Sequence, residues 1–186
     1  MSMRPWTTRS SRTIYTNPWL RLREDLVELP SGRTTIYGVV STGACVGVLP
    51  FLDPDTVVLV RQYRYVAGRH TWEMPTGGVM PGEPIPAAAQ RELAEESGYR
   101  AGRLEPVCVY HTSKSVMDET AHLFLASDLA KAEDRPEPDK TESFQVRPHR
   151  FQEVLGMVDA GEIVDSMTII AVLQAERRRV GRGRRR

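Results

Sequence analysis

Residues 86–97 constrain the fold more than any other part of the chain, because they place a helix between segments that look like β-strands. The segment is rich in Ala, Glu, Arg and Leu, with Pro86 at its start and Gly98 immediately after it. Proline fits the first helical position, and glycine commonly ends a helix. Alternating and β-branched runs precede the segment, and both strand-like and helical segments follow it. We therefore predict an α+β fold, in which helices pack against a mixed sheet.

Turn residues separate the other predicted elements. Two hairpin-like pairs come first, with turns at 30–32 and 53–55 and strands at 13–27, 34–41, 45–52 and 56–63. After the helix, strands are predicted at 104–111, 121–126 and 142–147, and helices at 149–160 and 165–179. Residues 130–140 have no apolar side chain after Ala132 and are predicted to form an exposed loop.

The composition fits one globular enzyme with a short extension. The chain has 186 residues, of which 40% are hydrophobic and 26% charged, so it can bury a sizeable core. No apolar run approaches the roughly 18 to 20 residues that span a bilayer, and the N-terminus has no secretory pattern. We therefore expect a cytoplasmic protein without a membrane partner.

The two cysteines, Cys45 and Cys108, lie in apolar runs, which favours buried free thiols over a disulfide.

Seven of the last ten residues are arginine, so the net charge of +1 conceals an acidic body. Without those arginines, 18 basic residues face 24 acidic ones, which gives a net charge of −6. Clustered arginines could bind a polyanion such as nucleic acid. We favour a solvated, mobile terminus for residues 177–186, because a glycine-punctuated end offers little apolar surface to pack.

The predicted helix carries three carboxylates on one side. Glu92 and Glu96 are four residues apart and project from the same face, with Glu95 beside them. Like charges at this spacing cost about 0.2 to 0.5 kcal/mol per pair, so the cluster needs a cation to be favourable. Oxygen ligands suit a hard divalent ion, Mg²⁺ or Mn²⁺. Taken alone, such a pair on a helix would more simply be an acidic, solvent-exposed face.

The residues around these carboxylates resemble the Nudix box. Residues 77–99 read GGVMPGEPIPAAAQRELAEESGY, in which seven glycine or charged positions have the spacing of that motif. Each position matches by chance roughly 6% of the time, so the full set would occur in this chain on the order of once in a million. Tyr99 departs from the aliphatic residue that is usual there. The resemblance implies a Nudix α/β/α sandwich and a metal-dependent enzyme.

The resemblance also implies roles within the box. Gly77 and Gly78 would let the backbone turn tightly into the site, and Gly98 would end the helix in the left-handed conformation. Arg91 would pair with the loop carboxylate of Glu83. The implied metal ligands for Mg²⁺, or alternatively Mn²⁺, are Glu92, Glu96 and the main-chain carbonyl of Thr76, with Glu95 in support.

Beyond the box, the sequence is similar to the ADP-ribose pyrophosphatase branch over roughly residues 10–175. The runs VRQYR at 60–64 and EMPTG at 73–77 resemble that branch, as does the segment 161–168. By this resemblance, Arg64 and Glu73 contact the substrate. The implied reaction is Mg²⁺-dependent hydrolysis of the diphosphate bond of ADP-ribose or a related nucleoside-diphosphate derivative, which gives AMP and a sugar phosphate.

The same branch uses a glutamate just before a strand as its catalytic base, and Glu142 occupies that place. Asp118–Glu119 is the second candidate, with Glu119 as the base, although either could be a solvated loop carboxylate. The segment 113–119 lacks the proline and glycine that are usual in the branch, so the second half of the substrate could differ from ribose. Lys114 could then meet an extra anionic group, although an exposed lysine is usually only solvated.

Residues 1–43 resemble the N-terminal β extension of the branch, ahead of a Nudix domain at 44–176. In relatives this extension crosses to a second subunit, where aromatic side chains stack on adenine. Trp19 and Tyr37 occupy the matching positions. An aromatic residue on a strand more often belongs to the core, but its flat π surface also suits a nucleobase. We expect a homodimer with exchanged N-terminal elements, on which substrate binding depends.

Other functions stay open at this point. The enzyme could instead cleave sugar nucleotides such as GDP-mannose, dinucleoside polyphosphates or NADH. A non-catalytic Nudix domain that senses a nucleotide is a different class, because fold alone does not imply chemistry, but the intact box argues against it. The remaining hypotheses are an isomerase with the same box and a nucleic-acid binder that acts through the arginine tail.

Overall fold

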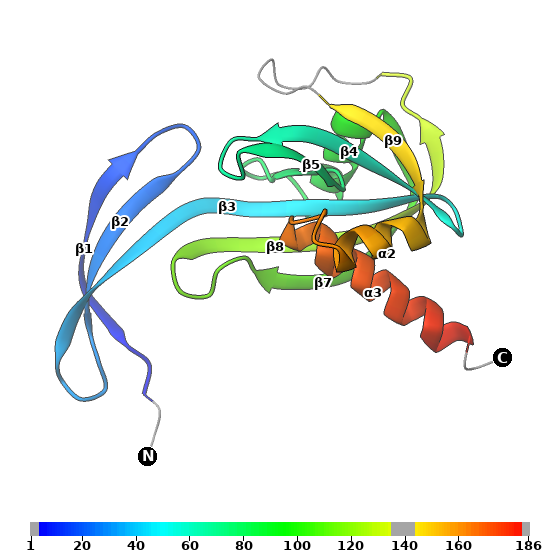
Figure 1. The fold of residues 1–186 in the computed structure, drawn as a ribbon. Helices are drawn as coiled ribbons and strands as arrows, with labels where there is room; N and C mark the ends of the chain where they lie inside the picture. The colour runs from blue at the N-terminus through cyan, green and yellow to red at the C-terminus, as the bar shows by residue number, and fades with distance from the viewer. Residues whose placement is uncertain (1–3, 135–143, 184–186) are drawn as a thin grey trace. The chain divides into compact units, whose positions relative to one another are not determined.

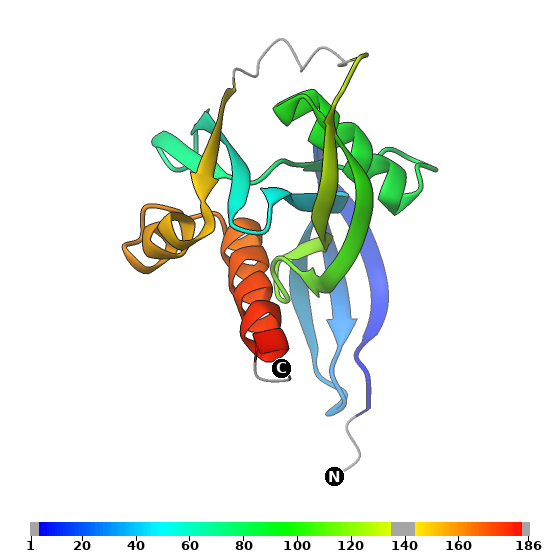
Figure 2. The ribbon, with the colours of Figure 1, turned by 90° about the vertical axis from the view of Figure 1, so that its right-hand side faces the viewer.

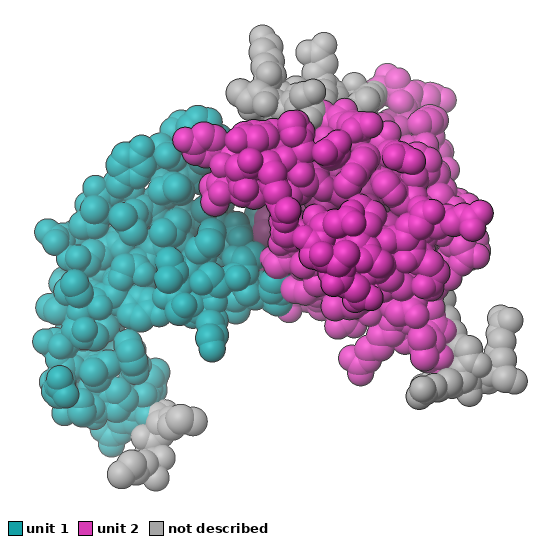
Figure 3. Space-filling model, viewed as in Figure 1, with its two compact units in different colours: residues 1–44, 110–120 teal, residues 45–109, 121–186 magenta. Residues whose placement is uncertain are grey.

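The chain forms two compact units, which Figure 3 shows in separate colours. The computed structural model describes residues 4–134 and 144–183. The N-terminal unit consists of residues 1–44 and 110–120, and the main unit of residues 45–109 and 121–186. Residues 110–120 belong to the N-terminal unit although they lie within the predicted Nudix domain.

Antiparallel strands make up most of the N-terminal unit (Figure 1): β1 (Thr7–Thr16), β2 (Arg21–Glu28) and the first half of β3 (Thr34–Asp53). The prediction of one strand over 13–27 is therefore wrong. The chain turns between β1 and β2, where the Asn17 side chain accepts the N–H groups of Trp19 and Leu20, both at 2.8 Å. An asparagine that bonds the backbone in this way replaces the strand ladder by a turn.

β3 is one strand where the sequence suggests two. It runs from Thr34 to Asp53 through Gly43, whose φ of 91° lies in the left-handed region. Glycine adopts this conformation without a steric penalty, so the strand continues through the irregularity instead of ending there. The predicted strands 34–41 and 45–52 are therefore joined.

The main unit combines strands with helices (Figures 1 and 2). The second half of β3 pairs with β4 (Thr56–Arg64) and β6 (Thr76–Gly78), and β4 lies between β5 (Arg69–Glu73) and β9 (Gln145–Arg150). β8 (Met117–Lys131) pairs with β3 and with β7 (Tyr99–His111). The helices are α1 (Ile85–Glu92), which continues into the π-helical turn η1 (Leu93–Ser97), α2 (Phe151–Asp159) and α3 (Ser166–Gly183).

Helices cover both faces of the second half of β3. Successive side chains of a strand point in opposite directions, so neighbouring residues of β3 pack against different helices. Val46 and Val48 are fully buried and pack against the α1–η1 helix. Gly47 faces the other way, where a Cβ would lie 2.3 Å from Met74 Cε and 2.9 Å from Met167 Cε of α3. This arrangement confirms the predicted α+β class, with helices packed on the two sides of the strand.

Several element boundaries differ from the prediction. β8 continues to Lys131, so the predicted exposed loop begins later than residue 130. β9 extends to Arg150, so α2 begins at Phe151 instead of residue 149. The N–H of Arg150 donates to the Glu153 carboxylate at 3.2 Å, and this capping contact fixes where the helix starts.

The arginine-rich tail is helical as far as residue 183, so the prediction of a mobile terminus is wrong for residues 177–183. Arg178 Nη1 donates to Glu105 Oε1 at 2.6 Å, and its Nη2 donates to two main-chain carbonyls of β7 at 3.0 and 3.2 Å. The Arg179 guanidinium lies 4.9 Å from the centre of the Phe151 ring. Arginine stems cover apolar surface while their charged ends bond to polar groups, which allows a basic segment to remain helical.

Two further expectations concern membranes and cysteines. In the described part of the chain, no helix is long and apolar enough to cross a membrane. Cys45 and Cys108 form no disulfide among the described residues, and they are half-buried instead of buried. Partial burial raises the pKa of the Cys108 thiol above its ordinary value.

Arg178→Ala is expected to lower the free energy of unfolding by about 1 kcal/mol, because hydrogen bonds to a partly exposed ion pair contribute modestly. The substitution removes all three bonds from Arg178 to β7. Arg177→Ala is the matched control, since Arg177 is exposed on the same helix and surface substitutions usually stay within about 0.5 kcal/mol. Urea unfolding followed by circular dichroism measures both variants. Equal stabilities would show that Arg178 does not anchor the tail.

Candidate active site

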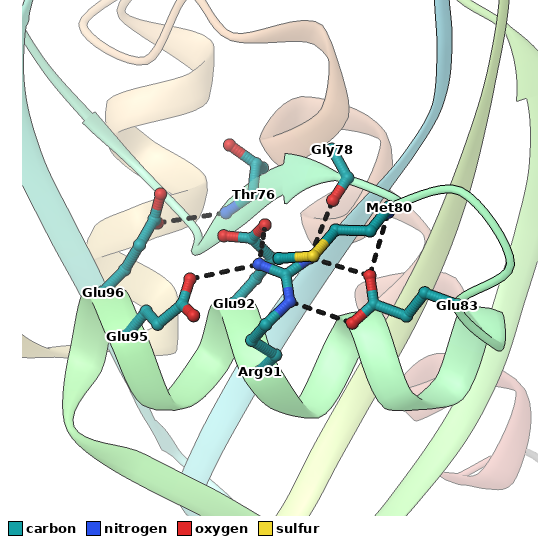
Figure 4. A network of polar contacts seen from close by, with 8 residues as sticks. All are labelled: Thr76, Gly78, Met80, Glu83, Arg91, Glu92, Glu95 and Glu96. Carbon is teal, nitrogen blue, oxygen red and sulfur yellow. Dashed lines mark hydrogen bonds and ion pairs between the residues drawn. The ribbon is translucent and has the colours of Figure 1, made fainter. Parts of the chain in front are cut away.

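The segment that follows β6 forms a loop and then the helix that carries the acidic residues. The helix begins at Ile85, becomes π-helical at Leu93 and stops at Gly98, whose φ is 73°. A glycine in the left-handed conformation is a common helix end. Figure 4 shows the side chains of Glu92, Glu95 and Glu96 on the side of the helix that faces β6.

Arg91 joins the loop to the helix (Figure 4). Its Nε and Nη2 donate to the two carboxylate oxygens of Glu83, each at 2.9 Å, so the expected pairing is present. Nη2 also donates to the Gly78 carbonyl at 2.9 Å. Nη1 donates to Glu92 at 2.6 Å and to Glu95 at 3.1 Å. One guanidinium therefore holds the loop and two of the three clustered carboxylates.

Glu83 stays ionised at neutral pH. Hydrogen bonds from Arg91, and then from the Met80 N–H, lower the pKa of Glu83 from 4.5 to about 2. The same pair raises the pKa of Arg91. A bidentate, charge-assisted pair fixes geometry as well as charge, so the loop is fastened to the helix.

Gly77 is required by the close approach of Glu92. A Cβ on Gly77 would lie 2.0 Å from Glu92 Cδ and 2.2 and 2.3 Å from its two carboxylate oxygens, so any other residue would displace that carboxylate. Glu92 and Glu96 are only 8% and 3% exposed. Glu96 Oε2 accepts the N–H of Thr76 at 3.1 Å. The alternative of a solvent-exposed acidic face is therefore wrong for these two residues.

The chemistry of this donor set fits a hard divalent cation, because all the donors are oxygen atoms. In the described residues, no three carboxylate, imidazole or thiol groups converge on one point. Arg91 draws Glu92 and Glu95 toward itself, and the N–H of Thr76 holds Glu96. Buried carboxylates need compensating positive charge. Arg91 supplies part of it, and a cation would compete with Arg91 for Glu92.

The π-helical turn was not predicted, because the sequence pattern indicates a regular helix to residue 97. Ser97 is buried, and its hydroxyl donates to the Leu93 carbonyl at 2.5 Å and accepts the N–H of Tyr99 at 3.3 Å. Such turns are frequent at functional sites. This turn contains Glu95 and Glu96, so Ser97 helps to set their positions. A serine beside the glycine that ends the helix is a weak sequence signal for this role.

A second ion pair joins the ends of β4 and β5. Arg64 Nη2 lies 2.7 Å from Glu73 Oε1, and Nε donates to both carboxylate oxygens at 2.9 and 3.0 Å. Burial raises the pKa of Glu73, and the hydrogen bond from Arg64 opposes that shift. Burial disfavours the charge on Arg64, but Glu73 and then Glu96 raise its pKa overall. The pair therefore lies within electrostatic reach of the acidic helix.

The predicted aromatic site residues lie in the N-terminal unit. The Tyr37 hydroxyl donates to the Ser115 carbonyl at 2.7 Å, and the ring of Trp6 meets that of Tyr37 edge-on, with centroids 6.0 Å apart. Trp19 is 78% exposed in the turn between β1 and β2, so it is not a core residue. Trp6 is a further exposed aromatic residue that the sequence pattern does not single out.

The structure describes only one of the two candidate bases. Glu119 belongs to the N-terminal unit and accepts the hydroxyl of Thr42 at 2.8 Å. Glu142 lies outside the described residues. Lys114 is exposed in the N-terminal unit. The structure thus brings together the glycines, Glu83, Arg91 and the three glutamates of the box, with Arg64 and Glu73 in electrostatic reach.

Two family models match the chain: residues 41–166 match the NUDIX domain, and residues 6–40 match the nucleoside diphosphate sugar hydrolase N-terminal domain. The chain belongs to the Nudix family. Nudix hydrolases generally need a divalent metal ion, which agrees with the buried carboxylates on the helix. Most of the N-terminal unit corresponds to the second domain model.

Similar proteins cover nearly the whole Nudix chain. The ADP-ribose pyrophosphatase of Bacillus subtilis (strain 168) is 32% identical over 165 residues, which is 89% of either chain. The ADP-ribose pyrophosphatase of Mycobacterium tuberculosis is 33% identical over 175 residues, 93% of this chain and 84% of that protein. The crystal structure of an ADP compounds hydrolase is similar with a TM-score of 0.87 at 20% identity, and the match covers 99% of each chain. This likeness confirms the α+β Nudix sandwich with its N-terminal β extension.

Glu83→Gln is expected to lower the stability of the Nudix protein more at pH 7 than at pH 2. The folded-state pKa of Glu83 is about 2 against an ordinary 4.5, so its stabilisation is complete above pH 4.5 and is lost as the pH falls through about 2. Urea unfolding at several pH values measures the difference between wild type and variant, which should shrink over this range. Glu133→Gln, at an exposed position, is the control. A difference that does not change with pH would contradict the role of Glu83.

Proposed function

We propose that this Nudix protein hydrolyses the diphosphate bond of ADP-ribose or a closely related nucleoside-diphosphate derivative, which gives AMP and a sugar phosphate. The observation that carries the proposal is the pair of buried carboxylates, Glu92 and Glu96, held against Gly77 and Thr76. Two proteins that are similar over most of the chain are ADP-ribose pyrophosphatases. The N-terminal match to a domain of nucleoside diphosphate sugar hydrolases supports the same substrate class.

Glu92 and Glu96 would hold Mg²⁺, or alternatively Mn²⁺, together with the Thr76 main-chain carbonyl and with Glu95 in support. When bound, the ion neutralises charge on the diphosphate and makes water more acidic. The protein keeps these donors in place through Arg91, which bonds to Glu92 and Glu95, and through the Thr76 N–H, which bonds to Glu96. Fixed donors lose little entropy when the substrate arrives.

Glu142 is the base that we propose for the attacking water, with Glu119 as the second candidate. The water oxygen attacks one phosphorus in line, the bond from that phosphorus to the bridging oxygen breaks, and the proton of the water passes to the base. The bridging oxygen leaves with the other phosphate. One carboxylate oxygen of Glu119 accepts a hydrogen bond from Thr42.

The Arg64–Glu73 pair is proposed to contact the substrate. The side chain of Glu73 is 3% exposed and that of Arg64 is 40% exposed, so the guanidinium can reach a ligand while it keeps its carboxylate partner. An arginine held in this way presents its remaining donors in a fixed direction, which suits phosphate and ribose oxygens. Lys114 is a further proposed contact for an anionic group. Sugar nucleotides such as GDP-mannose, dinucleoside polyphosphates and NADH are the alternative substrates.

We also propose a cytoplasmic homodimer in which the N-terminal unit contacts the partner subunit. This unit exposes large apolar side chains: Ile14 is 48%, Tyr15 is 55% and Ile36 is 65% exposed. Apolar residues gathered on one small sheet are typical of an interaction surface. In the dimer, the rings of Trp19 and Tyr37 would stack on the adenine of the substrate.

Glu96→Gln is expected to lower kcat at least about a hundredfold, which corresponds to roughly 2.7 kcal/mol of activation free energy. The variant should stay folded, because glutamine keeps an oxygen that can accept the Thr76 N–H. Turnover of ADP-ribose with Mg²⁺ and the circular dichroism spectrum measure the two effects. Glu133→Gln serves as the control with the same chemical change. Near-normal turnover by folded Glu96→Gln would rule out its role in metal binding.

A substrate panel tests the proposed reaction itself. Purified protein with Mg²⁺ should show its highest kcat/KM with ADP-ribose among ADP-ribose, GDP-mannose, a dinucleoside polyphosphate and NADH. AMP should appear together with a sugar phosphate. A higher value for another compound would transfer the assignment to that substrate class. Binding of a nucleotide without turnover of any compound would instead support a sensing domain.

Ile36→Arg is expected to weaken the dimer at least about fivefold, because loss of an apolar interface anchor commonly costs more than about 1 kcal/mol. Substrate affinity should fall with it, since the partner is proposed to contribute rings to the adenine site. Sedimentation equilibrium measures association, and the KM for ADP-ribose measures the consequence. Leu173→Arg, at a 48% exposed position in the main unit, is the comparison. A wild-type protein that sediments as a monomer would overturn the proposal.

A further inference from the structure

One face of the β9–β4–β5 sheet is separate from the Arg64–Glu73 pair. Residues that lie directly opposite one another in an antiparallel ladder share a face. Arg61 of β4 lies opposite Trp72 of β5 and Gln145 of β9, whereas Glu73 lies opposite Val60 on the other face. We call the first surface the basic–aromatic face, and its polar and aromatic residues are Arg61, Tyr63, His70, Trp72, Gln145, Arg147 and His149.

The basic–aromatic face carries positive charge. It carries two arginines and two histidines, and none of its residues is acidic. Arg61 and Arg147 are exposed, and no described carboxylate lies within ion-pair distance of either. This differs from Arg178, which bonds to Glu105, and from Arg91, which is surrounded by glutamates. Two exposed arginines without a carboxylate partner among the described residues give this face an attraction for anions.

The same face also carries aromatic and imidazole rings. Trp72 meets His149 with centroids 4.7 Å apart, and the Arg61 guanidinium is 5.8 Å from the centre of the Trp72 ring. Tyr63 meets His70 at 5.4 Å and is itself 54% exposed. Tyr63 and His70 are exposed, whereas Trp72 and His149 are half-buried. Exposed rings beside arginines provide stacking surfaces of the kind on which unstacked bases bind.

A cavity of about 260 Å³ opens on this face, lined by Arg61, His70, Phe144 and Gln145. His70 and Phe144 offer rings, Arg61 offers a positive charge, and the amide of Gln145 offers both a donor and an acceptor. A nucleobase attached to a phosphate requires this combination: a π surface, polar partners for its edge and a cation for its anionic group.

We propose that the basic–aromatic face binds single-stranded nucleic acid, with one base in the cavity and backbone phosphates beside Arg61 and Arg147. This activity is additional to the proposed hydrolysis. Ideal strand spacings put the Cα atoms of the two arginines roughly 8 Å apart, across two strands. Two separated cations and several rings suit consecutive nucleotides better than one free nucleotide. The proposal does not involve the arginine tail.

Fluorescence anisotropy with a fluorescein-labelled ten-nucleotide RNA at several salt concentrations tests the proposal. Each phosphate contact in a single strand contributes about 0.7 to the slope of log affinity against log salt. Arg61→Glu and Arg147→Glu should therefore each weaken binding and flatten that slope by at least about 0.7. Phe144→Ala should weaken binding roughly tenfold without changing the slope, because stacking carries no charge.

Arg177→Glu is the matched control, because it makes the same change of charge at an exposed site on α3. It should leave both affinity and slope close to those of the wild type. Wild-type binding by Arg61→Glu and Arg147→Glu, or equal losses in Arg177→Glu, would overturn the proposal. So would AMP binding that is as tight as RNA binding and equally sensitive to these substitutions, since the face would then hold a free nucleotide.

The test is independent of the proposed hydrolysis. Arg61→Glu and Arg147→Glu should keep the wild-type kcat/KM for ADP-ribose, because neither residue belongs to the proposed catalytic or substrate-binding groups. Thermal unfolding of each variant confirms that loss of RNA binding is not loss of folding. RNA binding by a protein that hydrolyses no diphosphate compound would support this proposal while the proposed function failed.

Discussion

Three carboxylates on one short helix repel one another, and Arg91 is the group that offsets this repulsion. It bonds to Glu92 and Glu95 through one nitrogen and to Glu83 through the other two. Glu83 in turn accepts the Met80 N–H, so the charge balance of the helix and the shape of the preceding loop depend on the same guanidinium. A site assembled in this way holds Glu92 and Glu95 on one guanidinium and keeps Glu92 buried, which strengthens the attraction of that carboxylate for a cation.

Gly77 and the buried Glu92 determine how close β6 can come to this helix. Gly77 leaves room for the Glu92 carboxylate, because a Cβ at this position would lie 2.0 Å from Glu92 Cδ. β3 supports both partners, since Val46 lies opposite Gly77 in the ladder with β6 and its side chain packs against the α1–η1 helix. The precise placement of the acidic groups is therefore a property of the core, and the core in turn tolerates two buried charges only because polar neighbours compensate them.

The sequence predicted those parts of the fold that depend on local pattern. The Nudix box, its helix and the glycine that ends it follow from fixed spacings, and the Arg91–Glu83 pair follows from resemblance. The π-helical turn at 93–97 could not be predicted, because the sequence pattern there fits a regular helix equally well. The helical tail was missed for a related reason: the tertiary contacts of Arg178 with β7 hold it, and no local pattern records them. Similarly, Gly43 looked like a break between strands, although a long ladder can continue through one left-handed residue.

The run VRQYR at 60–64 shows how one strand can serve two surfaces. Side chains alternate along it, so Gln62 and Arg64 point to one face while Arg61 and Tyr63 point to the other. Family resemblance accounts for Arg64, and burial at 6% exposure accounts for Gln62 as a packed residue. Neither explanation covers Arg61 and Tyr63, which are exposed on the opposite face. If that face had only to be soluble, any polar residues would suffice there. Their neighbours on β5 and β9 add rings and positive charge without a carboxylate, and this combination across three strands is what points to a ligand there.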